Sequence, residues 1–335
     1  MTLKDIAEIA GVSIKTASRA MNDYPDIKKE TKELILSIAK EHHYVPNIAA
    51  KSLRQNRSYS IGLVVPDLTN VFFGEVGIAI HNYFKKHGYS TLISFSEGQK
   101  STEIESLDSL LAKQVDGIIL ATVGSTGSRL KTILKQKNIP LVVIDNVVNN
   151  LRTNIVLHDN QYNSYLLTRH LYDQGCRNIG LISGPLSETS GRRRYEGFLK
   201  AMHEVGLEVN SNHIVYGDWT IKSGRRATEQ LLEQTGSTLD GIIAGNSLMA
   251  FGMYSVLNEH NLHIPSDIAV ASFDDLEIVE ALDPPLTTLS KVDSIIGELA
   301  AKRLYTLIKK PDDQELLETL VKAELKVRRS TLRNS

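Results

Sequence analysis

Cysteine is almost absent from this chain of 335 residues, and the single Cys176 excludes a disulfide framework or a metal site built on several cysteines. Long apolar runs are also missing, because no stretch approaches the roughly 18 consecutive apolar residues that a membrane helix needs. The N-terminal residues MTLKDIAEIAGVS lack the basic start and apolar segment of a secretory signal, so we expect a cytoplasmic protein without a membrane partner. The length and an ordinary composition, 41% hydrophobic and 23% charged, predict two or three globular domains.

Motifs of the common enzyme classes are missing as well. The chain has no GxxxxGK[ST] loop, no GxGxxG after its first apolar run and no HExxH. The segment GNSLM at 245–249 is not a nucleophile elbow, since Met249 stands where the second glycine belongs. We therefore predict a protein that is not an enzyme, with no catalytic residues, no metal site and no cofactor.

Charge is nearly balanced overall, at a net −1, but it is unevenly divided. Residues 1–60 carry ten Lys and Arg against seven Asp and Glu, so this segment has a charge of +3 and the rest of the chain −4. A small basic segment on a mildly acidic body is typical of a modest nucleic-acid contact surface. Many solvated helices carry three spare positive charges too, so charge alone does not decide.

Apolar residues at helical spacing predict three helices in the first 46 residues. The first ends at Gly11, and Ser13 is a favourable N-cap for a second over 14–21. The third, over about 29–43, contributes four apolar side chains to a shared core: Leu34, Ile35, Ile38 and Ala39. Two short helices joined through a glycine-containing turn form a helix-turn-helix, whose second helix enters a major groove. A small helical bundle with polar faces is the alternative.

A short basic segment, IAAKSLRQNRS, occupies residues 48–58. About eight residues cannot hold a stable isolated helix in water. A helix here makes sense if it folds only on a partner, and an unstructured linker is the alternative for the DNA-free protein. We therefore divide the chain into a head (1–46), a hinge (47–58) and a core (59–335).

Two stretches of the head match a known pattern. LKDIAEIAGVSIKTASRAMN at 3–22 follows IKDIAxxAGVSxxTVSRxxN, and YVPNIAAKSL at 44–53 follows YxPNxxAxxL. The head thus resembles the lactose-repressor (LacI/GalR) family of bacterial transcription regulators. It departs at Ala17, where the family favours valine, and this core position bears on stability. The resemblance implies DNA contacts in the second helix and the hinge, at Ser13, Ile14, Lys15, Thr16, Ser18, Arg19, Asn22, Asn47, Ala50, Leu53 and Arg54.

The chemistry of these side chains agrees with DNA contact. Arg19 can donate a bidentate pair of hydrogen bonds to guanine O6 and N7, and Ile14 can contact a thymine methyl. Leu53 matches the family's wedge, which enters a base step through the minor groove. Paired hinge helices imply a homodimer on a near-palindromic double-stranded operator. The chain end LKVRRSTLRNS has no leucine heptads, which favours a dimer over a tetramer.

The core contains an internal repeat of three short apolar runs. SIGLVVPDL (60–68), VDGIILATV (115–123) and IPLVVIDNV (139–147) resemble NIGLISGPL (178–186), LDGIIAGNS (239–247) and DIAVASFDD (267–275) in the same order. Runs rich in Val and Ile that alternate with helical patterns are typical of buried parallel strands. The predicted fold class is a small all-α helix-turn-helix head plus an α/β core of two Rossmann-like lobes. We expect the lobes at about 59–158 with 290–318 and at about 159–289 with 319–335.

Two similar α/β lobes suggest a ligand cleft between them, since open parallel sheets bind ligands beyond the carboxyl ends of their strands. The polar residues directly after the apolar runs are therefore candidates: Asp67, Asn70, Asp145, Asn146, Asn246, Asp274 and Asp275. Asp and Asn at such positions are also routine helix caps and turn formers.

The core resembles the same family over its whole length, as a core similar to periplasmic sugar-binding proteins. Stretches such as PDLTNVFF (66–73), GPLSETSGRRRYEGF (184–198) and FDDLEIVEALDPPLTTL (273–289) carry this resemblance. It implies effector contacts at Asn70, Phe72, Phe73, Asp145, Asp159, Arg194, Trp219, Asn246 and Asp274. Aromatic rings, carboxylates and amides suit a polyol, whose CH face is apolar and whose hydroxyls form hydrogen bonds.

One departure bears on the charge of the effector. The family commonly has Asn-Asp where this chain has Asn246-Ser247, so a carboxylate is missing there. The nearby run Arg192-Arg193-Arg194 concentrates positive charge, although we expect Arg192 and Arg193 to point to solvent. An anionic effector, such as a sugar phosphate or a uronate, is therefore one hypothesis.

The sequence thus predicts a cytoplasmic, DNA-binding repressor controlled by a small molecule between two lobes, and it leaves induction and corepression both open. One alternative is a catabolite-control-type regulator whose corepressor is a phosphorylated carrier protein, a class that shares the run AKQVDGII at 112–119. Another is an enzyme or a transport-type binding protein with an appended head. The missing catalytic motifs and signal oppose the latter.

Overall fold

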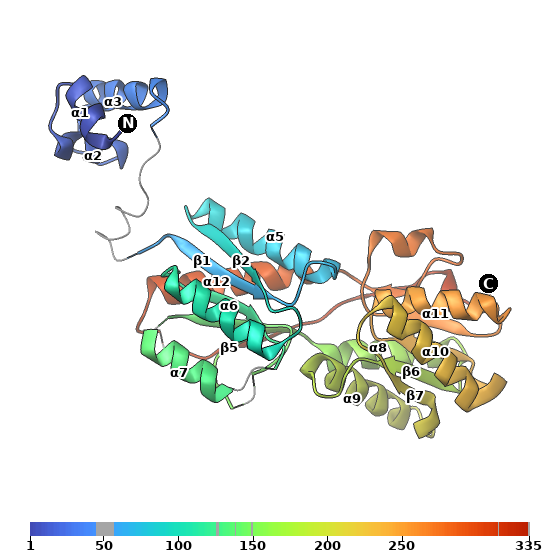
Figure 1. Cartoon of the computed structure of the whole chain (residues 1–335). Helices are drawn as coiled ribbons and strands as arrows, with labels where there is room; N and C mark the ends of the chain where they lie inside the picture. The colour runs from blue at the N-terminus through green and yellow to red at the C-terminus, as the bar shows by residue number, and fades with distance from the viewer. Residues whose placement is uncertain (45–56, 125–126, 138, 149, 314, 334–335) are drawn as a thin grey trace. The chain divides into compact units, whose positions relative to one another are not determined.

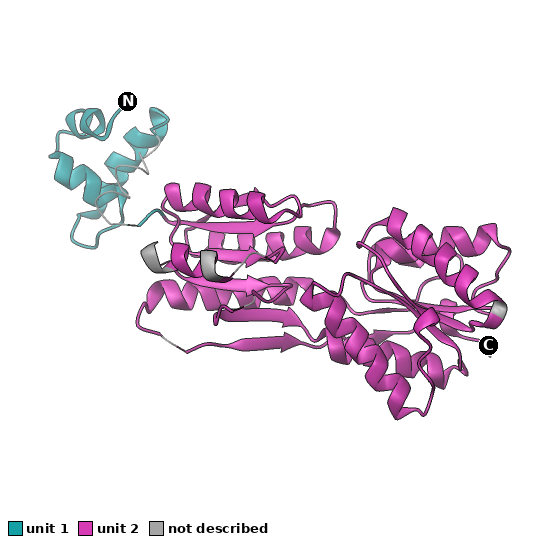
Figure 2. Cartoon of the chain, turned by 60° about the horizontal axis from the view of Figure 1, so that its bottom comes forward, with its two compact units in different colours: residues 1–58 teal, residues 59–335 magenta. Residues whose placement is uncertain are grey.

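The computed structural model describes residues 1–44, 57–124, 127–137, 139–148, 150–313 and 315–333. The chain forms two compact units, Met1–Ser58 and Tyr59–Ser335, which Figure 2 shows in different colours. The four DNA contacts predicted in the hinge, Asn47, Ala50, Leu53 and Arg54, lie outside the described residues.

The first unit contains the three predicted helices, α1 (Leu3–Ile9), α2 (Ile14–Met21) and α3 (Lys29–Glu41). α1 begins at a capping box, in which Thr2 and Asp5 each accept a hydrogen bond from the other's backbone N–H. The helices share a small core around Ile6 and Ile35. Leu34, predicted to belong to this core, is instead 48% exposed. It lies at the edge of the apolar stripe of α3, and the two short partner helices do not cover it.

The second unit contains two lobes, each built on a parallel sheet (Figure 1). The first sheet has the strand order β11-β5-β4-β3-β1-β2. Its strands are β1 (Ser60–Val65), β2 (Ser90–Phe95), β3 (Ile118–Ala121), β4 (Leu141–Ile144), β5 (Asn154–His158) and β11 (Glu318–Val321). Helices α5 (Val71–Lys86) and α12 (Asp293–Lys309) cover one face, and α6 (Lys100–Ala112) and α7 (Gly127–Lys137) cover the other. β1, β3 and β4 are buried almost throughout, as apolar runs predict for central strands.

The second sheet has the strand order β7-β6-β8-β9. Its strands are β6 (Ile179–Ser183), β7 (Ile214–Tyr216), β8 (Gly241–Ala244) and β9 (Ala269–Ser272). Helices α8 (Asn160–Asp173) and α9 (Thr189–Glu204) pack together on one face, and α10 (Ile221–Thr235) and α11 (Ser247–Glu259) on the other (Figure 1). Short 3₁₀ turns lie in the connections: η1 (Ser211–His213), η2 (Gly236–Thr238), η3 (Glu277–Ala281) and η4 (Arg329–Thr331). The predicted α/β core of two lobes is confirmed.

The chain passes between the lobes three times, which brings the first-sheet strand ends near the second lobe. After β9, a short strand β10 (Thr288–Leu289) pairs antiparallel with β12 (Leu325–Lys326). The segment expected to close the first lobe at residue 318 continues further, because β11 pairs in parallel with β5 from Glu318 to Val321. The first lobe therefore ends after Val321.

Candidate functional site

The exposed side of α2 is the candidate DNA-contacting surface. Ser13 is its N-cap, and the Ser13 hydroxyl oxygen accepts a hydrogen bond from the Thr16 backbone N–H at 3.0 Å. Ala17 and Ala20 face the core, while Ile14 is 49% exposed and Lys15 is exposed beside it. The helix thus presents an apolar and a basic side chain to solvent at its N-terminal end, where a recognition helix contacts base edges.

Arg19 is held in place by two neighbours of the head. Its guanidinium lies 2.7 Å from the Asp26 carboxylate and 4.5 Å from the centre of the Tyr24 ring. The hydrogen bond from Arg19 lowers the pKa of the exposed Asp26. Asn22 closes the helix, and its amide donates to the Ser18 carbonyl oxygen at 2.7 Å. Base contact by Arg19 therefore requires it to share or leave Asp26.

A cavity of about 290 Å³ lies where the strands of both sheets end. Eight of the nine predicted effector residues line it: Asn70, Phe72, Phe73, Asp145, Arg194, Trp219, Asn246 and Asp274. The ninth, Asp159, is the N-cap of α8 and accepts a hydrogen bond from the Tyr162 backbone N–H. Asp159 is not among the residues that line the cavity, and its contact with an effector stays a prediction.

Helix starts and strand ends position most of the cavity wall. Asn70 caps α5 and Asn246 caps α11, each by accepting a backbone N–H with its side-chain oxygen. Asp145 follows β4 with a positive φ of 66°, a conformation that costs energy for a residue with a Cβ atom and is found at functional sites. Asp67 and Asn146, named as candidates from the strand ends, also line the cavity.

Trp219 packs against bare backbone in the second lobe. A Cβ atom added at Gly184 would lie 1.9 Å from the Trp219 ring, so only glycine fits there. The indole N–H donates to the Glu188 carboxylate at 2.8 Å, and the Asn246 amide donates to the Trp219 carbonyl oxygen at 3.0 Å. These contacts fix the ring at the cavity wall.

Arg194 is 7% exposed and brings the one Lys or Arg side chain found among the described lining residues. Its Nε donates to the Asn160 amide oxygen at 2.8 Å, and its Nη1 donates to the Gly245 carbonyl oxygen. The guanidinium carbon lies 4.1 Å from the centre of the Phe273 ring and 5.0 Å from that of Trp219. Hydrogen bonds and stacked rings stabilise a charge that burial alone would disfavour.

Three half-buried carboxylates face Arg194 across the cavity. Burial and the negative charge of Glu188 raise the pKa of Asp145 to about 6. Burial also raises the pKa of Glu188 and of Asp274, against the opposing effect of Arg194. Without a ligand, the negative charges of these carboxylates therefore repel one another.

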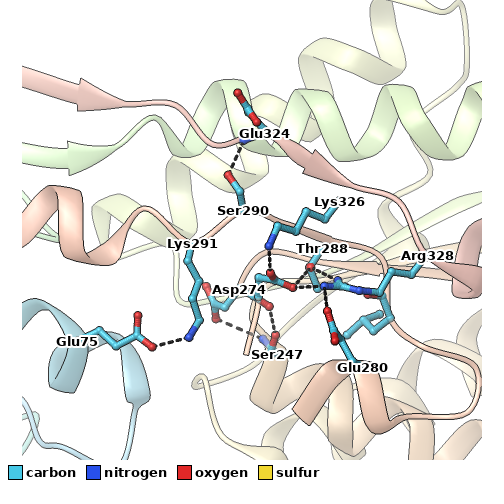
Figure 3. Close-up of polar contacts among 12 residues, drawn as sticks. Glu75, Ser247, Asp274, Glu280, Thr288, Ser290, Lys291, Glu324, Lys326 and Arg328 are labelled. Carbon is cyan, nitrogen blue, oxygen red and sulfur yellow. Dashed lines mark hydrogen bonds and ion pairs between the residues drawn. The ribbon is translucent and has the colours of Figure 1, made fainter. Parts of the chain in front are cut away.

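Two of the three arginines behind the hypothesis of an anionic effector lie outside the cavity lining. Arg192 and Arg193 are exposed on α9 and do not line the cavity. Ser247 is fully buried, its hydroxyl donates to the Asp274 carbonyl oxygen, and its backbone N–H donates to the Asp274 carboxylate (Figure 3). Ser247 therefore does not create a region without acidic side chains, because the Asp274 carboxylate lies beside it.

Several lining residues were not singled out from the sequence. His158 ends β5, a strand without a clear apolar run, and Glu188 immediately precedes α9. Asp218 and Thr220 flank Trp219 in the loop after β7. The sequence contained only a weak indication that Glu188 has a special role, since an acidic residue before a helix is a common cap. Here the Glu188 side chain makes no capping hydrogen bond and accepts a hydrogen bond from Trp219 instead.

The two lobes contact each other directly at the start of α9. The Ser190 backbone N–H donates to the Asn146 side-chain oxygen at 3.2 Å, and the Val147 backbone N–H donates to the Thr189 hydroxyl at 3.1 Å. A free N–H of α9 is thus satisfied by a residue of the other lobe. Figure 3 shows an ion pair of Lys291 with Glu75, which joins the crossing segment before α12 to α5 of the first lobe.

Asp275, also a strand-end candidate, lies away from the large cavity. Its carboxylate forms ion pairs with Lys326 and Arg328 and accepts a hydrogen bond from Thr288. These partners hold its pKa below the ordinary value in spite of burial. Asp275 thus ties together the segments that connect the lobes.

Two other kinds of site are absent from the described ranges. In that part of the chain, no helix combines the length and apolar character needed to cross a membrane. Over the same residues, no group of three or more His, Cys, Asp or Glu side chains is placed to hold a metal ion.

Comparison with known proteins agrees with this architecture. Residues 2–47 match the model of "Bacterial regulatory proteins, lacI family", and residues 58–328 match "Periplasmic binding proteins and sugar binding domain of LacI family". The chain is 32% identical to the HTH-type transcriptional repressor PurR of Pasteurella multocida, over 98% of both chains. It is 31% identical to the ribose operon repressor of Escherichia coli K12, over 94% of this chain and 95% of the repressor.

A solved structure of the Lac repressor dimer, bound to operator and the anti-inducer ONPF, superposes with a TM-score of 0.89. It shares 27% identity over 99% of both chains. Head and core together match one family, which the resemblance read from the sequence also indicated. The chain belongs to the LacI family of bacterial regulatory proteins.

Proposed function

We propose that this protein is a homodimeric transcriptional repressor that binds a near-palindromic operator under the control of a small polyhydroxylated effector. The cavity carries this proposal, because residues from both lobes form its wall. A ligand there makes different contacts when the lobes move, and control of DNA binding needs only different affinities for the two states. Such a repressor acts in the cytoplasm, where chromosomal operators lie.

The names of the relatives support this function. Both curated relatives are repressors, and one is named for the ribose operon. The rings of Phe72 and Trp219 with the carboxylates and amides of the wall suit the two faces of a polyol. Nothing in the described residues favours the phosphorylated carrier protein, which stays a prediction.

An apolar surface supports the homodimer. Helix α5 packs against the edge strand β2, and large apolar side chains are exposed on both: Val71, Ile78, Ile93 and Phe95. Exposed apolar patches and unpaired strand edges mark association surfaces. Light scattering on the full chain should give twice the chain mass of 37.2 kDa. We expect Ile78→Glu to give monomers, whereas Leu316→Glu, beside the opposite edge strand, should stay dimeric.

The DNA-binding part is tested by selecting operators from random duplex DNA with the full chain. We expect near-palindromic sites whose affinity falls steeply with salt. Arg19→Ala should cost about 1–3 kcal/mol and relax one base position, while Lys15→Ala tests whether that lysine contacts phosphate, in which case it weakens all sequences about equally. Unchanged specificity in Arg19→Ala would contradict the placement of α2 in the major groove.

The effector part is tested by thermal unfolding of the full chain with neutral sugars, sugar phosphates, uronates and nucleobases. A true ligand at 100 times its dissociation constant adds about 2.7 kcal/mol to stability. The same ligand must change operator affinity. A blank screen with intact operator binding would contradict small-molecule control and direct the next test to a phosphorylated carrier protein.

A further inference from the structure

The charges around the cavity between the lobes are strongly unequal. Five carboxylates line it, from Asp67, Asp145, Glu188, Asp218 and Asp274. The described lining residues include one arginine, Arg194, and one histidine, His158, as the possible cations. Negative charge therefore exceeds positive charge at the wall even when the histidine is protonated.

Arg194 does not cancel this excess by direct contact. Its Nε and Nη1 donate to the neutral oxygens of Asn160 and Gly245, and its plane lies against Phe273. Among the described residues no ion pair joins it to a carboxylate, so it acts on the acids only across space. One cation at that range cannot balance several acids.

The three inner carboxylates are held in place by neutral donors. Asp145 accepts from the Asn146 amide at 3.0 Å, Glu188 from the Trp219 indole at 2.8 Å, and Asp274 from the Ser247 backbone N–H at 3.3 Å. These hydrogen bonds fix the carboxylates but leave their charges in place. Asp145 and Glu188 come from opposite lobes, and the negative charge of Glu188 disfavours the ionised form of Asp145.

We propose that the effector is a polyhydroxylated molecule that carries a positive charge, an amino sugar or amino polyol in chemical class. The proposal rests on the proposed role of the cavity as the effector site. An ammonium group between Asp145 and Glu188 supplies donors to both and compensates the repulsion across the lobes. The apolar face of the ring packs on Trp219, and hydroxyls donate to the remaining acids.

This charge balance opposes the anionic effector considered from the sequence. A phosphate or carboxylate would add negative charge beside five acids, and the exposed Arg192 and Arg193 cannot reach it from outside the cavity lining. A neutral sugar can donate hydrogen bonds but leaves the excess of charge uncompensated. The expected order of affinity is therefore amino compound, neutral compound, anion.

The test uses the full chain at pH 7 and matched compounds that differ in one substituent. The sets are hexoses (glucosamine, glucose, glucose 6-phosphate, glucuronate), pentoses (2-amino-2-deoxyribose, ribose, ribose 5-phosphate) and acyclic polyols (glucamine, sorbitol, gluconate). Calorimetry gives the affinities, and fluorescence anisotropy with the selected operator follows DNA binding in the same samples. Within a set that binds, we expect the amino compound to bind about tenfold more tightly than the neutral one. A tenfold gain corresponds to an interaction free energy between that of a charge pair in bulk water and that of a buried charge pair.

Two variants separate charge from shape. Glu188→Gln should reduce the preference for the amino compound over the neutral one several-fold. Glu196→Gln makes the same change on the exposed part of α9, outside the cavity, and should leave the preference unchanged. A phosphate or uronate that binds as well as its neutral counterpart would overturn the charge assignment while small-molecule control stands. No binding in any set, with operator binding intact, would overturn the assignment together with polyol control.

Discussion

The two lobes share one architecture, yet they build their halves of the cavity differently. The first lobe contributes residues between its strands and the helices that follow, such as Asn70, which caps α5, and Asp145 after β4, and Asn246 holds an equivalent place in the second lobe. The second lobe contributes side chains held by contacts deep within it. Arg194 is fixed between hydrogen bonds and the Phe273 ring, and Trp219 rests on Gly184. The second face is therefore the more rigidly preorganised.

This difference suggests a division of work between the lobes. A preorganised face loses little conformational entropy when a ligand binds, so we expect the second lobe to contribute more of the binding free energy. The first lobe completes the wall through the loop at Asp145 and Asn146, which already contacts the start of α9 in this structure. Four predictions test the division, from the largest expected effect to the smallest.

Removing the charge of Arg194, which the second lobe contributes to the cavity wall, should have the largest effect on stability. Arg194→Met deletes two hydrogen bonds and leaves Asp145, Glu188 and Asp274 without a compensating charge. We expect a loss of about 2–4 kcal/mol in the free energy of unfolding, measured by urea denaturation. The matched variant Arg193→Met lies on the exposed side of the same helix and should stay within about 0.5 kcal/mol of wild type. Equal effects of the two variants would refute the rigid role of Arg194.

Crowding the aromatic contact tests the same face by shape. Gly184→Ala forces Trp219 away, and we expect a loss of about 1–3 kcal/mol with a change in the fluorescence of the chain's one tryptophan. Gly77→Ala on the buried side of α5 in the first lobe is the control, because its Cβ would meet its nearest atom, in the Leu63 side chain, at an ordinary 3.5 Å. Alanine favours a helix more than glycine does, so this control should gain about 0.5–1 kcal/mol. An unchanged fluorescence in Gly184→Ala would show that the ring is not fixed.

The acids of the cavity make stability depend on pH. The pKa of Asp145 lies near 6, above its unfolded value, so its ionisation destabilises the folded state above pH 6. That loss is recovered as the pH falls from 6 towards the unfolded pKa. Asp145→Asn keeps the positive φ and removes the charge, so we expect it to be more stable than wild type by about 1–2 kcal/mol at pH 7.5, with little difference at pH 4. If the stability difference between Asp145→Asn and wild type instead increased as the pH falls, it would contradict the repulsion between Asp145 and the other carboxylates.

The link between the lobes should have the smallest effect on stability. Asn146→Ala removes an oxygen that caps α9 from the other lobe and should cost about 1 kcal/mol. It should also weaken the change in operator affinity that an effector produces, because closure loses a contact. Asn258→Ala, exposed near the end of α11, is the matched control and should change neither quantity. A normal effector response in Asn146→Ala would remove this contact from the mechanism.

The sequence predicted the strands that are buried throughout and missed those that are partly exposed, including the interior strand β5. The six repeated apolar runs contain β1, β3, β4, β6, β8 and β9, because strands buried on both faces must be apolar throughout. β2 and β7 lie at sheet edges and are partly exposed, and β11 joins its sheet from near the end of the chain. Their pairing depends on long-range backbone contacts, which leave little local signal.

The same contrast holds for the site. Asn70, Asn246 and Trp219 were predicted because motifs of the family carry them, and the cavity contains them. Asp159 shares the residue type and the position after a strand, yet its carboxylate caps a helix. Glu188 and His158 also line the cavity, but no local sequence pattern predicts this position. A residue's type after a strand does not tell whether its side chain turns to the helix or to the cavity.

By itself, the sequence determined the helix-turn-helix head, the two α/β lobes and the family. These follow from local periodicity, from caps such as Ser13, and from apolar runs that only a buried parallel sheet accommodates. Only the tertiary structure decided the charge of the cavity. Arg192 and Arg193 are exposed as expected, but the sequence did not predict that Asp145 and Glu188, 43 positions apart, face one cavity. Electrostatic interaction depends on distance through space and on burial, and neither quantity is written in the order of residues.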